Sequence, residues 1–133
     1  MPAIMAKRPA KRSRPRKSNR RTTKSRSAAR SAAGKLPKEA VTLTVQLKAR
    51  EGQELLLEAE LRALITPTRK EDGCIVYELL RSADAPGGFL FYEVWASREA
   101  HTAHTRTPHF LRWAARKDVL AASRESSFWK KIL

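Results

Sequence analysis

The sequence holds a single cysteine, Cys74, among 133 residues. One thiol excludes an internal disulfide and cannot by itself build a cysteine-based metal cluster, so a reducing compartment is expected. No apolar run approaches the roughly 18 residues of a membrane span, and no hydrophobic signal-peptide core follows the basic start. These absences predict a cytoplasmic chain without a membrane span.

Acidic residues are almost missing from the first 40 positions, where Glu39 stands alone against 14 lysines and arginines. The other 93 positions hold 14 basic and 12 acidic residues, so the formal net charge of +15 belongs mainly to the N-terminal part. From Ala6 to Lys38 there is no aromatic residue, and Leu36 is the one large aliphatic residue. Such a segment buries too little apolar surface to offset the entropy of ordering. We therefore expect a disordered basic tail over residues 1–40 and one folded domain over residues 41–133.

The basic tail permits several interpretations. Its clustered lysines and arginines favour a weak contact with nucleic acid or another polyanion through residues 7–38. A solvated extension, a start codon assigned too early (Met5 is as good a candidate as Met1) and an organelle transit peptide fit the same composition. The folded part is nearly neutral, which does not favour a nucleic-acid-binding domain.

Apolar residues in the folded part follow two different periods. Strict alternation, typical of a half-buried strand, runs from Val41 to Ala49. A helical period then places Leu57, Leu61 and Leu64 on one face, and Pro67 is expected to end or kink that helix. The expected strands are 41–49, 74–81, 89–95 and 126–133, and the expected helices are 53–65, 98–104 and one that starts at 107–108. This β-α-β-β-α-β order predicts an α+β, ferredoxin-like fold.

The third expected strand is unusual because both of its faces carry mainly apolar side chains. One face carries Phe89, Phe91, Glu93 and Trp95, and the other carries Leu90, Tyr92 and Val94. Glu93 is the exception on its face, since a buried carboxylate needs a partner. We expect an arginine, Arg69 or Arg81, or else a histidine to supply it. Helices can cover one face of the sheet only, so the second apolar face predicts a homodimer.

Four short motifs resemble a known family: Glu71 to Glu78 (EDGCIVYE), Tyr92 to Trp95 (YEVW), Ala103-His104, and Thr107 to Phe110 (TPHF). Together they are similar to the antibiotic biosynthesis monooxygenase domain, a family of dimeric α+β barrels that includes small quinol monooxygenases. The resemblance covers about residues 41–133. It implies oxidation of aromatic phenols or quinols by dioxygen without a cofactor, although relatives include haem-degrading proteins and isomerases.

Two departures from the family narrow this reading. No asparagine occurs in residues 41–133, whereas the aromatic-polyketide branch pairs an asparagine with its tryptophan. No histidine occurs between Phe110 and Ser123, where haem-degrading members place an axial ligand. Both branches therefore fit less well than the quinol monooxygenases.

The candidate catalytic residues are His104, His109 and Glu93. An imidazole titrates near neutral pH, so His104 can accept a phenolic proton, with His109 as the alternative base and Glu93 as a supporting group. The structural alternative is that these histidines cap helix ends or pack under the strand. The expected substrate-binding side chains are Trp95, Tyr77, Phe91 and Phe110, each of which is also a plausible core residue.

No metal or cofactor is predicted. His101 is expected at the surface, and the H-x2-H-x4-H spacing of the three histidines across Pro108 matches no recognised ligand pattern. No glycine-rich phosphate loop, dinucleotide fingerprint or serine-nucleophile motif is present. The leading hypothesis is thus a cofactor-independent monooxygenase acting on a quinol or aromatic phenol with dioxygen. The alternatives are a non-catalytic ligand-binding barrel with a polyanion-binding arm, or an isomerase or haem-degrading relative of the same fold.

Overall fold

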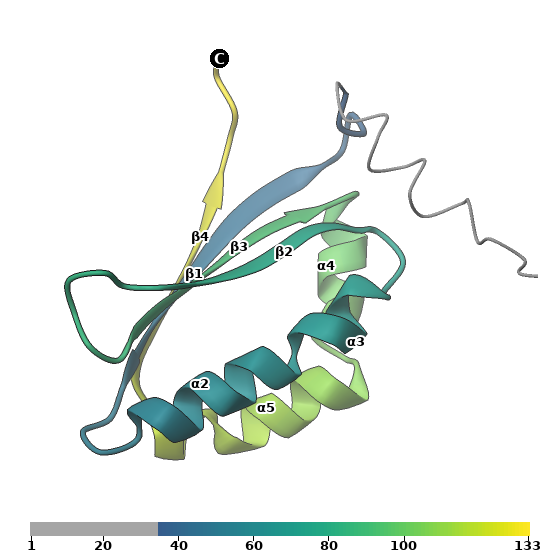
Figure 1. The fold of residues 1–133 in the computed structure, drawn as a ribbon. Coiled ribbons are helices and arrows are strands. Elements are labelled where there is room, and N and C mark those ends of the chain that lie inside the picture. Colours follow the sequence, from purple (N-terminus) through teal and green to yellow (C-terminus); the bar gives the residue numbers. More distant parts are fainter. Residues whose placement is uncertain (1–34) are drawn as a thin grey trace, which may run out of the picture. The chain divides into compact units, whose positions relative to one another are not determined.

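The computed structural model describes residues 35–133. Most of the predicted basic tail, residues 1–40, therefore lies outside the described region. The elements are β1 (Val41–Ala49), α2 (Glu54–Ala63), α3 (Ile65–Arg69), β2 (Cys74–Arg81), β3 (Gly88–Trp95), α4 (Arg98–His104), α5 (Pro108–Leu120) and β4 (Ala121–Trp129). The strands form one antiparallel sheet in the order β2-β3-β1-β4, and the helices lie on one side of it (Figure 1). This is the predicted α+β, ferredoxin-like fold.

The core lies between the sheet and the helices. Alternate residues of β1 and β3 face it, and the register pairs Leu43 with Glu93 and Val45 with Phe91. Leu57 and Leu61 of α2 are fully buried against this face, as their helical spacing predicts. The site described below lies against this face, over the two central strands of the sheet.

The first helical region differs in detail from its prediction. The helix does not run unbroken from 53 to 65; α2 ends at Ala63, and α3 continues from Ile65 through Pro67. Proline has no backbone N–H to donate, but the first turn of a helix leaves such donors unpaired, so Pro67 fits at the third position of α3. The prediction that Pro67 ends or kinks the helix was therefore wrong in position: the break between α2 and α3 lies at Leu64, and α3 continues through Pro67 to Arg69.

The last strand also differs from its prediction. β4 spans Ala121–Trp129 rather than 126–133, and Ile132 and Leu133 are exposed. The missed segment, Ala121 to Glu125, has no large apolar side chain, and it pairs with β1 alone at the edge of the sheet. In α5 the buried residues are Trp113 and Leu120, whereas Val119 is exposed.

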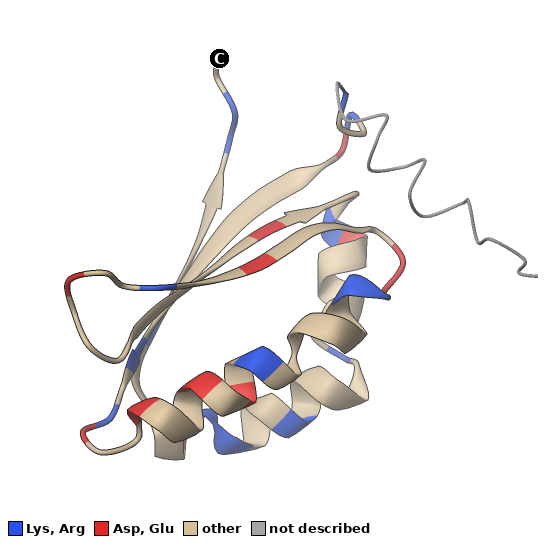
Figure 2. Cartoon of the chain, in the orientation of Figure 1, with Lys and Arg blue, Asp and Glu red and all other residues tan. Residues whose placement is uncertain are grey.

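Charges of both signs lie on the helices (Figure 2). The Glu58 carboxylate in α2 pairs with Arg62 at 3.5 Å, as its i, i+4 spacing predicts, and also with Arg81 of β2. Glu60 pairs with Arg116 of α5. The arginines are largely exposed, so these pairs contribute little to stability beyond fixing how α2 and α5 align. None of the helices in residues 35–133 is long and apolar enough to cross a membrane.

The sheet face opposite the helices carries exposed apolar side chains. Leu80, Tyr92 and Trp129 are 46%, 38% and 60% exposed, on three different strands. The Trp129 indole donates to the Thr44 hydroxyl at 2.7 Å, which ties the ring to the neighbouring strand β1. No helix of the described part of the chain covers this face (Figure 1).

Candidate active site

Three segments of the chain meet at one end of the helical layer. The turn between α3 and β2 brings Glu71, the end of α4 brings His104, and the start of α5 brings His109. Gly73 makes this approach possible: its φ is +82°, and a Cβ there would lie 2.6 Å from the Cβ of Ala100 in α4. Its carbonyl accepts from the Ala96 N–H at 2.8 Å, which joins the turn to the end of β3.

A side-chain hydroxyl caps the start of both α4 and α5. The Ser97 hydroxyl accepts from the Ala100 N–H at 3.1 Å at the start of α4. The Thr107 hydroxyl accepts from the Phe110 N–H at 3.3 Å at the start of α5, and it donates to the His104 carbonyl at 2.8 Å. Thr107 therefore fixes the positions of the two histidine-bearing segments relative to each other.

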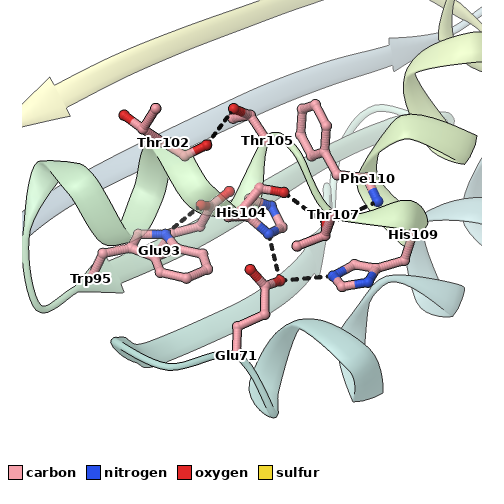
Figure 3. Close-up of polar contacts among 9 residues, drawn as sticks. All are labelled: Glu71, Glu93, Trp95, Thr102, His104, Thr105, Thr107, His109 and Phe110. Atoms are coloured by element: carbon pink, nitrogen blue, oxygen red, sulfur yellow. Dashed lines mark hydrogen bonds and ion pairs between the residues drawn. The ribbon is translucent and has the colours of Figure 1, made fainter.

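The two histidines share one carboxylate oxygen (Figure 3). His104 Nδ1 and His109 Nε2 each lie 2.7 Å from Glu71 Oε2. The His104 side chain is 2% exposed, and burial lowers its pKa, although the hydrogen bond to the Glu71 carboxylate acts in the opposite direction. With Glu71 ionised, Nδ1 of His104 carries the proton and donates, which leaves a lone pair on Nε2.

Aromatic rings surround His104. The Trp95 ring lies 4.8 Å away at a tilt of 35°, and the rings of Phe110 and Tyr77 meet the imidazole edge-on at 5.1 and 5.6 Å. Burial strongly raises the pKa of the Tyr77 phenol, so this hydroxyl stays protonated and can act as a donor. These rings pack around the imidazole, and among the described residues Glu71 is the hydrogen-bonding partner of the His104 ring.

Glu93 is buried on the sheet floor, with its Oε2 accepting from the Trp95 indole N–H at 2.9 Å. Burial raises the pKa of Glu93 to about 7, while the Trp95 hydrogen bond and the positive charge of Arg124 lower it. The prediction that Arg69 or Arg81 pairs with Glu93 was wrong. Arg69 donates to the Tyr77 carbonyl at 3.0 Å, and Arg81 pairs with Glu58.

A small cavity lies between these groups. Its lining comprises Val45, Leu47, Leu64, Tyr77, Phe91, Glu93, His101, His104, Phe110, Trp113 and Arg124. Its volume is about 20 Å³, room for roughly one water molecule. A diatomic gas fits this space, whereas an aromatic ring requires side chains at its rim to move.

The structure brings together most of the predicted site residues. Tyr77, Phe91, Glu93, His104 and Phe110 all line the cavity, whereas Trp95 lies behind it, fully buried against the His104 ring, and His109 reaches the cluster through Glu71.

Sequence reasoning misplaced or missed four residues of this site. His101 is not a surface residue: it is half-buried, lines the cavity and contacts the Trp95 ring edge-on at 6.0 Å. Burial, followed by the nearby charges of His104 and two arginines, lowers its pKa. Glu71, Trp113 and Arg124 were not proposed as site residues. Of these three, only Glu71 could have been found from the sequence, because it is the first residue of the first motif on which the family resemblance depends.

The fold and this histidine–carboxylate cluster define a small α+β, ferredoxin-like domain with a buried polar site under one sheet face. The sequence model of one family, described as "Antibiotic biosynthesis monooxygenase", matches residues 40–116. A Mycobacterium tuberculosis protein named "Putative monooxygenase Rv0793" is 40% identical over 75 residues, which cover 56% of this chain and 73% of that protein.

Solved structures agree with the sequence match. The structure of Rv0793 has a TM-score of 0.67 at 33% identity and covers 71% of this chain and 96% of that one. PA3566 from Pseudomonas aeruginosa has a TM-score of 0.69 at 30% identity over the same shares. The chain belongs to the antibiotic biosynthesis monooxygenase family, as its motifs predict. Membership supports a monooxygenase-type function and hence an enzyme.

Proposed function

We propose that the protein is a cofactor-independent monooxygenase that oxidises a quinol or aromatic phenol with dioxygen, and that His104 is its catalytic base. One observation carries the assignment: Glu71 anchors His104 Nδ1 at 2.7 Å, beside a small cavity lined largely by aromatic and aliphatic side chains. This arrangement leaves Nε2 as the basic atom of the ring. Glu71 thus positions the base, much as a buried carboxylate orients a histidine in other enzymes.

The reaction needs no added reductant, because the substrate supplies all four electrons that dioxygen accepts. His104 Nε2 takes the phenolic proton, and the resulting anion gives electrons to dioxygen and forms a carbon–oxygen bond. The ring carbon then loses its hydrogen as a proton while the oxygen–oxygen bond breaks. One oxygen atom stays on the ring as a quinone carbonyl, and the other leaves with two protons as water.

Glu93 and Arg124 have supporting roles in this proposal. The Glu93 pKa of about 7 suits a carboxyl group that accepts or returns a proton near neutral pH. Arg124 is exposed at the rim of the cavity, and its long side chain is the one that we expect to move when an aromatic substrate enters. Phe91, Phe110, Tyr77 and Trp113 then form the walls against the ring, and Trp95 supports His104 from behind.

We also propose that the protein works as a homodimer. The support is the exposed apolar face formed by Leu80, Tyr92 and Trp129, which a second copy of the sheet would cover. Such a pair would form the closed α+β barrel expected from the family resemblance.

Oxygen consumption by the purified full-length chain tests the enzymatic proposal. A panel of hydroquinones and polycyclic phenols is screened in the presence of EDTA, with labelled ¹⁸O₂ to follow the atoms. We expect one labelled oxygen in the quinone and one in water. Uptake no faster than the uncatalysed rate across the panel, or hydrogen peroxide with no labelled quinone, would contradict the proposal.

His104→Gln tests the base with the active substrate in hand. Loss of a general base typically lowers the rate about 100- to 10,000-fold. The melting temperatures of His104→Gln and His109→Gln are measured beside their rates, because a packing histidine affects stability instead. A stable and active His104→Gln removes the assignment, and an inactive, stable His109→Gln beside it transfers the role to His109.

A further inference from the structure

We propose that Glu71, His104 and His109 form a binding site for a divalent transition-metal ion, with Zn²⁺ the best match. One ligand atom of each residue lies within 4.8 Å of the other two. Two imidazole nitrogens and one carboxylate oxygen are a ligand set of zinc sites that keep a fourth position open. The expectation of no metal considered the three histidines alone, and in the structure Glu71 takes the place of His101.

The distances require only side-chain adjustment. Both histidine nitrogens lie 2.7 Å from Glu71 Oε2. Zinc bonds of about 2.0–2.1 Å in tetrahedral geometry place the ligand atoms roughly 3.4 Å apart. Each nitrogen must therefore withdraw from the oxygen by about 0.7 Å. Rotations within the three side chains can supply such a shift without moving the backbone.

The backbone around the three ligands is well fixed. The Glu71 N–H donates to the Thr68 carbonyl at 3.0 Å, and the Cys74 N–H donates to the Glu71 carbonyl at 3.2 Å. Thr107 bonds both to the His104 carbonyl and to the first turn of α5, which carries His109. The ligands are thus held in place before any ion arrives, which lowers the entropy lost on binding.

Metal binding exchanges two hydrogen bonds for coordination. His104 Nδ1 and His109 Nε2 both give up their protons to the opposite ring nitrogens, and the Glu71 carboxylate offsets part of the ion's charge. His104 Nε2 then carries a proton and can no longer accept one. Bound Zn²⁺ should therefore inhibit oxygen uptake. Inhibition rests on the proposed function, whereas metal binding does not.

Calorimetric titration of ZnCl₂ into the full-length chain tests the site. The protein is prepared without a histidine tag, stripped with EDTA and dialysed; its 3 histidines and 1 cysteine keep other binding low. We expect one equivalent of Zn²⁺ to bind. His109→Gln and Glu71→Gln should weaken binding by more than the about 10- to 100-fold that loss of an outer-shell partner costs. The matched control, His101→Gln, removes a neighbouring histidine outside the cluster and should bind as the wild type does.

Several outcomes separate the two proposals. Absence of saturable binding, or equal losses in His101→Gln and His109→Gln with all variants folded by circular dichroism, would overturn the metal site. Co²⁺ provides a second readout, since tetrahedral coordination gives it strong visible absorption that both cluster variants should abolish. Zinc binding with the expected variant pattern but no oxygen uptake in EDTA would support the site and count against the proposed oxidation alone.

Discussion

The buried carboxyl group of Glu93 should make the folded protein less stable as the pH rises, and Glu93→Gln should remove that loss. The Glu93 pKa is about 7 in the folded protein against a model value of 4.5. Between these two values the folded state holds a proton that the unfolded state has released, so the free energy of unfolding falls with increasing pH. The full stability is present below about pH 4.5 and is lost as the pH passes through 7.

The size of the effect follows from the pKa difference. One pKa unit corresponds to about 1.4 kcal/mol, so the shift from 4.5 to about 7 amounts to about 3 kcal/mol at pH 8 and above. Glutamine has almost the same shape, carries no charge and can still accept from the Trp95 indole. Glu93→Gln should therefore be more stable than the wild type by up to about 3 kcal/mol at pH 8 and nearly equal at pH 4.5.

Urea unfolding at fixed protein concentration, followed by circular dichroism from pH 4.5 to 8.5, measures this difference. His101 and His104 have lowered pKa values, so their contribution to stability is lost as the pH falls. Both proteins share these histidines, so their contribution largely cancels in the difference. Glu51→Gln makes the same chemical change at an exposed position in the turn after β1 and serves as the control. A Glu93→Gln advantage that does not grow with pH would refute the reasoning.

Three further predictions concern other parts of the chain. Gly73→Ala should destabilise the protein by about 1–3 kcal/mol more than Gly52→Ala. Both glycines have a positive φ, but only at position 73 would the new Cβ clash with Ala100, so equal melting temperatures of the two variants would contradict this. In sedimentation equilibrium at micromolar concentration, the wild type should have twice the 15.0 kDa mass of one chain, and Tyr92→Glu should have the mass of one chain. A monomeric wild type would contradict the proposed dimer. Deleting residues 7–38 should abolish a salt-sensitive mobility shift of duplex DNA, and retained binding by the shortened chain would place the contact in the folded domain.

Local signals made much of the fold predictable from the sequence. Ser97 and Thr107-Pro108 mark helix starts within a few residues, and the alternation in Val41–Ala49 defines both a strand and its buried face. The start of β4 was predicted too late because the run from Ala121 to Glu125 has no large apolar residue and no such alternation. It becomes a strand only by pairing with β1, which no short window of the sequence records.

The site was predictable only in part, for a related reason. His104, Glu93 and Phe91 stood out because polar or aromatic residues there were hard to explain otherwise. Glu71 looked like an ordinary turn residue, and its meeting with His104 and His109 spans 33 and 38 positions along the chain. That contact depends on how α3, α4 and α5 pack, which the sequence periods do not specify.

The place of β1 at the centre of the sheet has a consequence for folding. β1 pairs with β4 between residues as far apart as Thr42 and Trp129, so one of its two edges stays open until the segment through β4 has left the ribosome. Arg124, at the rim of the cavity, lies on that last strand. During synthesis the histidines and Glu71 are made well before the cavity can close. The growing chain therefore exposes an unpaired strand edge, and it gains a complete site only when its last strand docks.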